Sequence, residues 1–120
     1  MELKLFDSER RVMEVLWEAD APVTAKEIAA KLGETVGWNK NTTYTVIKKC
    51  VEKGAIERRE PNFQCFPRVR REEAQAAAAA ELVEKVFDGS ASLLFASLLS
   101  GGQLPPEEIR RLRALIDGLE

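Results

Sequence analysis

The stretch WNKNTTYTVIKKCVEKG, residues 38–54, carries signals for both helix and strand. Its second half ends in Gly54 like an ordinary helix, but Thr42 to Val46 are β-branched or aromatic residues, which favour strands. Asn39 is a good helix N-cap and glycine is a common helix stop, so we predict one helix that ends at Lys53. The poor helix formers at its start therefore need another explanation.

A helical wheel gives these residues different positions around the helix. At about 100° per residue, Thr43, Val46, Ile47 and Cys50 fall on one face, which we expect to lie in the core. The other side carries polar and basic residues. Opposite the core face lie Asn41, Tyr44, Thr45 and Lys48, with Thr42 and Lys49 on one shoulder and Val51 on the other. The threonines thus have different roles, because Thr43 faces inward while its neighbours face outward.

Two further helices are expected upstream. The first follows Asp7, a candidate N-cap, and ends near Asp20, and its apolar residues recur at helical spacing. They are Val12, Met13, Leu16 and Trp17. Pro22 then forces an extended link, in which Val23 can pair briefly as a strand.

The second helix opens with a capping box. The Thr24 hydroxyl can accept from the Glu27 amide while the Glu27 carboxylate reaches back to Thr24. Ile28, Ala29 and Leu32 give its inner face, and we expect Gly33 to end it.

A β-hairpin is predicted after the third helix. Residues 56–59 and 63–66 form two short strands around a turn that contains Pro61 and Asn62. Three helices followed by a basic hairpin define a winged helix-turn-helix, whose third helix enters the major groove of DNA. The fold class is therefore mainly α with a small β wing.

Charge is unevenly distributed along the chain. The net charge of -2 would argue against nucleic acid, but residues 38–71 hold nine basic and three acidic side chains. Residues 72–120 hold four basic and nine acidic side chains. We therefore expect a DNA-binding domain over residues 1–71 and a domain with another role over residues 72–120.

The residues expected to read DNA bases are Asn41, Thr42 and Thr45. They lie in the first two turns of the third helix, and amide, hydroxyl and methyl groups match base edges. A second group is assigned to the DNA backbone or left uncertain: Asn39, Lys40, Tyr44, Lys48, Lys49, Arg58 and Arg59. Alternating strand geometry would direct only one of the two arginines toward DNA. Alternatively, the polar residues are caps and solvated side chains, and Tyr44 packs against a neighbouring helix.

Residues 72–120 are predicted to form three helices, over 72–87, over 90–100 and after Pro106. The middle one is apolar on nearly every side, and the last carries an apolar seam, so both need a partner surface. We predict a homodimer through these helices, the alternative being that the tail folds back on its own winged helix. The expected interface residues are Leu82, Val86, Leu93, Leu94, Phe95, Leu98, Leu99, Ile109, Leu112, Ile116 and Leu119.

Catalysis, metal binding and membrane insertion have little support in the sequence. There is no histidine, no acid pair and no glycine-rich phosphate loop. Cys50 and Cys65 are too few and too widely spaced for a zinc site, and we expect both to be buried thiols. No apolar run approaches the ~20 residues that span a bilayer, so we expect a cytoplasmic protein that is not an enzyme and has no cofactor.

Several of these motifs together resemble the BlaI/MecI family of penicillinase and methicillin-resistance repressors. They are ERRVMEVLW in the first helix, the entry from Trp38 to Thr42, TVIKKCVEKGAI through the third helix into the wing, and the three-helix tail. The resemblance implies a bacterial homodimer that binds a palindromic operator and represses transcription through its C-terminal dimer interface. It also implies base reading by Asn41, Thr42 and Thr45. The backbone contacts that it implies come from Lys40, Lys48, Lys49 and the basic residues of the wing.

The chain departs from the family pattern in places. Tyr44 stands where members linked to antibiotic resistance usually have a basic or polar residue, and Pro105 replaces the usual serine cap of the last helix. Such members are inactivated when a membrane sensor-protease pathway cuts an Asn-Phe bond, but residues 95–98 here read FASL. The tail also lacks the paired cysteines of the copper-responsive branch. A different operator is therefore expected, with an upstream sensor or protease pathway of unknown identity.

Two alternatives to a repressor follow from the same features. The winged helix could be a protein-interaction module whose apolar C-terminal helices recruit a partner. A winged-helix repressor with a small-molecule pocket would need a ligand cavity that this short chain does not indicate.

Overall fold

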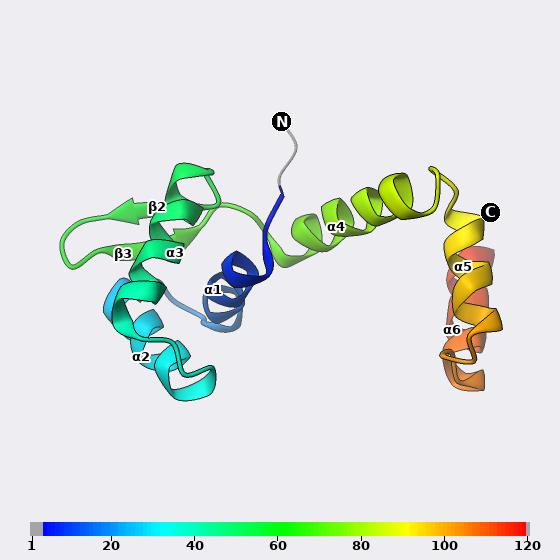
Figure 1. Cartoon of the computed structure of the whole chain (residues 1–120), viewed down its shortest axis with the longest axis horizontal. Helices are drawn as coiled ribbons and strands as arrows, with labels where there is room; N and C mark the ends of the chain where they lie inside the picture. Colours follow the sequence, from blue (N-terminus) through cyan, green and yellow to red (C-terminus); the bar gives the residue numbers. More distant parts are fainter. Residues whose placement is uncertain (1–3, 120) are drawn as a thin grey trace. The chain divides into compact units, whose positions relative to one another are not determined.

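The computed structural model describes residues 4–119 and contains six helices and a three-stranded sheet within them (Figure 1). The fold is mainly α, as predicted. The chain divides into two compact units, one up to Ala78 and one from Ala79. The functional division expected between residues 71 and 72 remains a prediction.

Helix α1 spans Asp7–Glu18, and Phe6 rather than Asp7 is its N-cap. The prediction was one residue late. The Glu9 carboxylate lies at the third helical position and accepts a hydrogen bond of 2.7 Å from the Phe6 amide, so the helix start is fixed by Glu9 and not by the Asp7 side chain.

Helix α2, Ala25–Thr35, starts with the predicted capping box and follows a two-residue strand β1, Val23–Thr24. The Glu27 amide donates to the Thr24 hydroxyl oxygen at 3.1 Å. Gly33 was predicted to end this helix, but the helix continues to Thr35. The end comes later because Gly37 adopts φ 80° and its amide donates to the Leu32 carbonyl at 3.0 Å.

Helix α3, Lys40–Glu52, has both the N-cap and the glycine stop that were predicted from the sequence. The Thr42 amide donates to the Asn39 side-chain oxygen at 2.8 Å, and Gly54 beyond the helix has φ 81°. The face predicted to be internal is buried, with Thr43, Ile47 and Cys50 at 0% exposure and Val46 at 7%.

The wing consists of strands β2, Ile56–Arg59, and β3, Gln64–Pro67, which pair antiparallel with Arg58 opposite Cys65. Strand β1 pairs with the other edge of β3 and completes the sheet in the order β1-β3-β2. The strand predicted to start at Phe63 starts one residue later, because Phe63 has φ 50° and belongs to the turn.

One hydrophobic core holds the first unit together. Helices α1, α2 and α3 cover it together with the sheet, and Met13, Ile28, Ile47 and Ile56 are almost fully buried at its centre. The Trp17 indole N–H donates to the Val69 carbonyl at 2.8 Å, which fastens the segment after the wing to α1. This core fixes the position of α3 and of the wing beside it.

The remaining helices are α4, Arg71–Val86, α5, Ala91–Ser100, and α6, Pro106–Asp117. None of the three contains a buried residue. Ser90 caps α5 by accepting from the Leu93 amide at 3.2 Å, whereas Pro105 caps α6 without a side-chain hydrogen bond. No helix within residues 4–119 is both long and apolar enough to cross a membrane.

Candidate nucleic-acid interface

The exposed face of α3 carries the residues predicted to read bases. Asn41, Thr42 and Thr45 are all exposed, and three lysines of the same helix, Lys40, Lys48 and Lys49, are exposed around them. Hydrogen-bond donors and acceptors thus lie among positive charges, which is the arrangement that base reading and phosphate binding require.

The polar side chains on this face differ in how many of their hydrogen-bonding groups remain free for a ligand. The Thr45 hydroxyl donates to the Asn41 carbonyl at 2.9 Å, so its methyl group and hydroxyl lone pairs are what it offers to a ligand. The Asn39 oxygen is occupied by the helix cap. Within residues 4–119, the hydrogen bonds at Asn41 and Thr42 involve only their backbone groups, so both side chains retain their full hydrogen-bonding capacity.

Tyr44 is half-buried and packs against the wing. Its ring meets the Phe63 ring edge to face, with centroids 6.2 Å apart and planes at 64°. The Lys40 ammonium lies 5.8 Å from the Tyr44 ring centroid. Tyr44 therefore packs against the wing turn, and it also packs against the hydrophobic core of the first unit.

The wing arginines are stacked on aromatic rings and paired with carboxylates. The Arg58 guanidinium lies 3.7 Å from the Phe63 ring centroid and its Nε donates to Glu60. The Arg59 guanidinium lies 4.0 Å from the Phe66 ring centroid and pairs with Glu57. In the sequence analysis both arginines counted as free positive charges, and neither aromatic stack was predicted.

Glu57 and Glu60 remain ionised and offset part of the positive charge of the wing. The hydrogen bond from Arg59 is the main reason why the pKa of Glu57 is lowered, and Arg68 at 2.7 Å adds to it. The hydrogen bond from Arg58 is the main cause of the lowered pKa of Glu60. The positive excess of residues 38–71 is therefore concentrated on α3.

Lys53 was counted with the basic stretch but points away from the exposed face. Its ammonium donates to the Glu9 carboxylate at 2.6 Å and to the Lys4 carbonyl at 2.7 Å, and it lies 4.3 Å from the Phe6 ring centroid. Glu9 is 1% exposed. The pair is structural, and the only signal for Glu9 in the sequence was its position three residues after the cap.

The arginines after the wing have acidic partners in the first unit. Arg70 pairs with Glu73 at 3.2 Å, and Arg71 pairs with Glu14 at 3.1 Å. The Arg71–Glu14 pair secures the start of α4 to α1, so Arg71 serves as a structural link rather than part of the face on α3.

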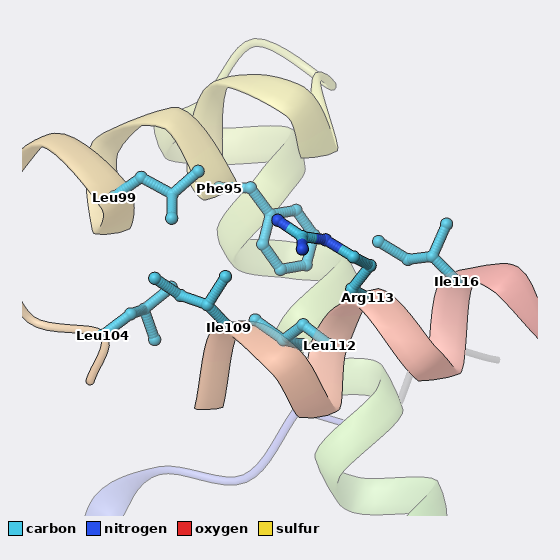
Figure 2. Close-up of a pocket in the computed structure, with 7 residues that line it drawn as sticks. All are labelled: Phe95, Leu99, Leu104, Ile109, Leu112, Arg113 and Ile116. Atoms are coloured by element: carbon cyan, nitrogen blue, oxygen red, sulfur yellow. The ribbon is translucent and has the colours of Figure 1, made fainter. Parts of the chain in front are cut away.

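The second unit presents apolar side chains to its surface. None of the eleven residues predicted to form a dimer interface is buried in the single chain. Among them, Ile116 is 55% exposed, and Leu115, which the prediction omitted, is 66% exposed. A groove of about 210 Å³ lies between α5 and α6. Figure 2 shows Phe95 and Leu99 on one side of it and Leu112 on the other.

The winged-helix fold and the polar, basic face of α3 define a protein of the DNA-binding winged helix-turn-helix class. Residues 5–118 match the family model described as penicillinase repressor. The chain belongs to that family, which is a family of bacterial transcriptional repressors.

Known relatives agree over nearly the whole chain. It is 22% identical over 116 residues to the penicillinase repressor of Bacillus licheniformis, covering 95% of this chain and 90% of the relative. It is 23% identical over 116 residues to the methicillin resistance regulatory protein MecI of Staphylococcus aureus, covering 95% and 94%. The solution structure of the DNA-binding domain of the repressor BlaI matches 61% of this chain and 90% of that domain, with a TM-score of 0.55 and 23% identity.

Proposed function

We propose that this repressor binds a palindromic operator as a homodimer, with α3 of each copy in the major groove. The observation that carries the proposal is the exposed face of α3, where Asn41, Thr42 and Thr45 lie among lysines while the opposite face is buried. We assign base reading to these three residues and phosphate contacts to Lys40, Lys48 and Lys49. As a bacterial repressor it would act in the cytoplasm, where the chromosome lies.

The homodimer is proposed because the second unit cannot bury its own apolar residues. Helices α4, α5 and α6 hold no buried residue, and Leu93, Leu99 and Ile116 are about half exposed. Exposed apolar surface on this scale favours a partner helix, and a second copy supplies one with matching chemistry. Two-fold symmetry of the protein then predicts two-fold symmetry of the operator.

Affinity capture of genomic fragments on the purified full-length protein tests this function. We expect enrichment of sites with inverted repeats, with binding that weakens steeply as salt rises, since each phosphate contact releases counterions. A variant in which Lys48 and Lys49 are both replaced by Ala serves as the control and should lose this affinity. Enrichment of no sequence, or affinity that is indifferent to salt, would contradict the proposal.

A second candidate function rests on the groove between α5 and α6. In that reading the apolar tail recruits a different protein, and the winged helix is an interaction module. The repressor and the interaction module are distinguished by the mass of the complex and by DNA binding. A heteromeric complex from native lysate without DNA binding favours the interaction module. We also propose that an upstream sensor or protease pathway inactivates the repressor.

A further inference from the structure

Two wing arginines have nearly the same local surroundings but lie on opposite faces of the sheet. Each is stacked on a phenylalanine ring and bonded to a glutamate, Arg58 through Phe63 and Arg59 through Phe66. Arg58 is opposite Cys65, which is buried, so Arg58 shares the face of the sheet that contacts the core. Arg59, its neighbour along the strand, lies on the other face.

Phe63 connects the wing to the helix predicted to enter the groove. One contact of its ring is the Arg58 guanidinium at 3.7 Å, and another is the edge-to-face contact with Tyr44 of α3 at 6.2 Å. Its carbonyl accepts from the Ala25 amide at 3.0 Å, and its amide donates to the Glu60 carboxylate at 3.3 Å. Phe63 is therefore fixed from the wing, from α2 and from α3 at once.

This arrangement leaves part of the Arg58 guanidinium available. Its Nε is taken by Glu60, whereas no hydrogen bond within residues 4–119 engages its two terminal nitrogens. The Arg58 side chain is 45% exposed. A stacked guanidinium with two free N–H groups is well suited to a phosphate oxygen, because its planar fork is already oriented. Arg59 has no comparable connection, since no ring contact or hydrogen bond within the described residues joins its ring partner Phe66 to α3.

We propose that Arg58, and not Arg59, is the wing residue that binds the DNA backbone, and that Phe63 is a positioning residue that holds the Arg58 guanidinium beside α3. The proposal rests on the operator-binding function above. Tyr44 then acts through Phe63, as part of the support for the wing and not as a reader of bases. The ligand of Arg58 is a phosphate of duplex DNA, so its contribution does not depend on sequence.

A double-mutant cycle on the full-length protein tests the proposal, with the most strongly captured genomic fragment as one probe and random-sequence duplex DNA as the other. Arg58→Ala should weaken binding to both probes by about tenfold at low salt and reduce the slope of log affinity against log salt by about one. Arg59→Ala is the matched control and should change neither quantity. Equal effects of the two substitutions would overturn the assignment.

The positioning role of Phe63 is tested by asking whether the effect of a Phe63 substitution on DNA affinity requires Arg58. Phe63→Leu should weaken binding in the wild-type background but cause no further loss when Arg58 is already Ala, and Phe63→Tyr should restore affinity because it keeps an aromatic face. Additive losses would overturn the positioning role. If Phe63→Leu fails to fold, Arg58→Lys replaces it: retained affinity would refute the stacked guanidinium, and lost affinity would support it. Failure of the wild-type protein to bind either probe would instead refute operator binding itself.

Discussion

At the scale of single residues, the outward-facing methyl group of Thr45 is the clearest candidate for a specificity contact. Its hydroxyl already donates to the Asn41 carbonyl, so a thymine methyl group would meet the Thr45 methyl. We expect Thr45→Ala to reduce discrimination at one base pair by about 1 kcal/mol, whereas Lys49→Ala should weaken all sequences alike. Competition binding with single-base operator variants measures both.

Thr45→Val is the control for that prediction, because it keeps the methyl group and removes the hydroxyl. It should preserve discrimination. Loss of discrimination by Thr45→Val and Thr45→Ala alike would mean that the hydroxyl, and not the methyl group, reads the base.

The partly buried ion pair between Lys53 and Glu9 leads to a separate prediction about stability. Among residues 4–119, Lys53→Met would leave the Glu9 carboxylate, which is 1% exposed, with the Phe6 amide as its remaining partner. We expect a loss of about 2 kcal/mol in the free energy of unfolding, measured in urea. Lys48→Met, an exposed position on the same helix, should change it little, and similar losses from both would contradict the pairing.

Two buried thiols predict how stability depends on alkaline pH. Burial raises the pKa of Cys50 from its usual 9.0 to about 12 and that of Cys65 to about 11. In the unfolded chain both thiols ionise near their usual pKa, so their stabilising contribution is complete below about pH 9 and is lost as pH rises toward the folded values.

Unfolding free energies of the wild type and of Cys50→Ala at about pH 8 and about pH 10.5 test this dependence. We expect a smaller decrease with pH in the variant, whatever its starting stability, because one of the two groups that ionise preferentially in the unfolded chain is gone. An identical decrease in both proteins would rule out Cys50 as a source of the effect.

At the scale of secondary structure, two glycines near helix ends have opposite requirements. Gly54 has φ 81°, and a Cβ there would meet nothing, so Gly54→Ala should cost about 1 kcal/mol through backbone conformation alone. Gly33 lies inside α2, and a Cβ there would make only an ordinary contact with the Trp38 carbonyl at 3.5 Å. Gly33→Ala should therefore stabilise the protein by up to about 1 kcal/mol. Thermal unfolding of the two variants should shift in opposite directions.

The limits of sequence reasoning are visible in the same elements. The start of α3 was predictable because Asn39 caps a helix through an amide three residues away, and the buried face followed from helical periodicity. The end of α2 was predicted wrongly at Gly33. Either Gly33 or Gly37 could end the helix, and only the positive φ of Gly37 distinguishes them. The partners of Lys53 and Arg58 depend on which segments meet in three dimensions, which local spacing does not reveal.

At the scale of the whole molecule, the first unit has a closed core and the second does not. Met13, Ile28 and Ile47 are fully buried in the first unit, whereas the helices of the second bury no residue. The exposed apolar side chains of the tail favour a partner surface, which agrees with the proposed dimer.

Ile116→Glu gives the most direct test of that assembly. Ile116 is 55% exposed in the single chain, so a glutamate there would cost little in a monomer but would bury an unpaired charge in a dimer. We expect the variant to sediment as a 13.4 kDa monomer and to bind the operator at least tenfold more weakly, because joining two half-site readers in one molecule raises their effective concentration. Arg110→Glu, an exposed charge change on another side of α6, should leave the dimer intact. A dimeric Ile116→Glu variant with unchanged operator affinity would exclude this face of α6 from the interface.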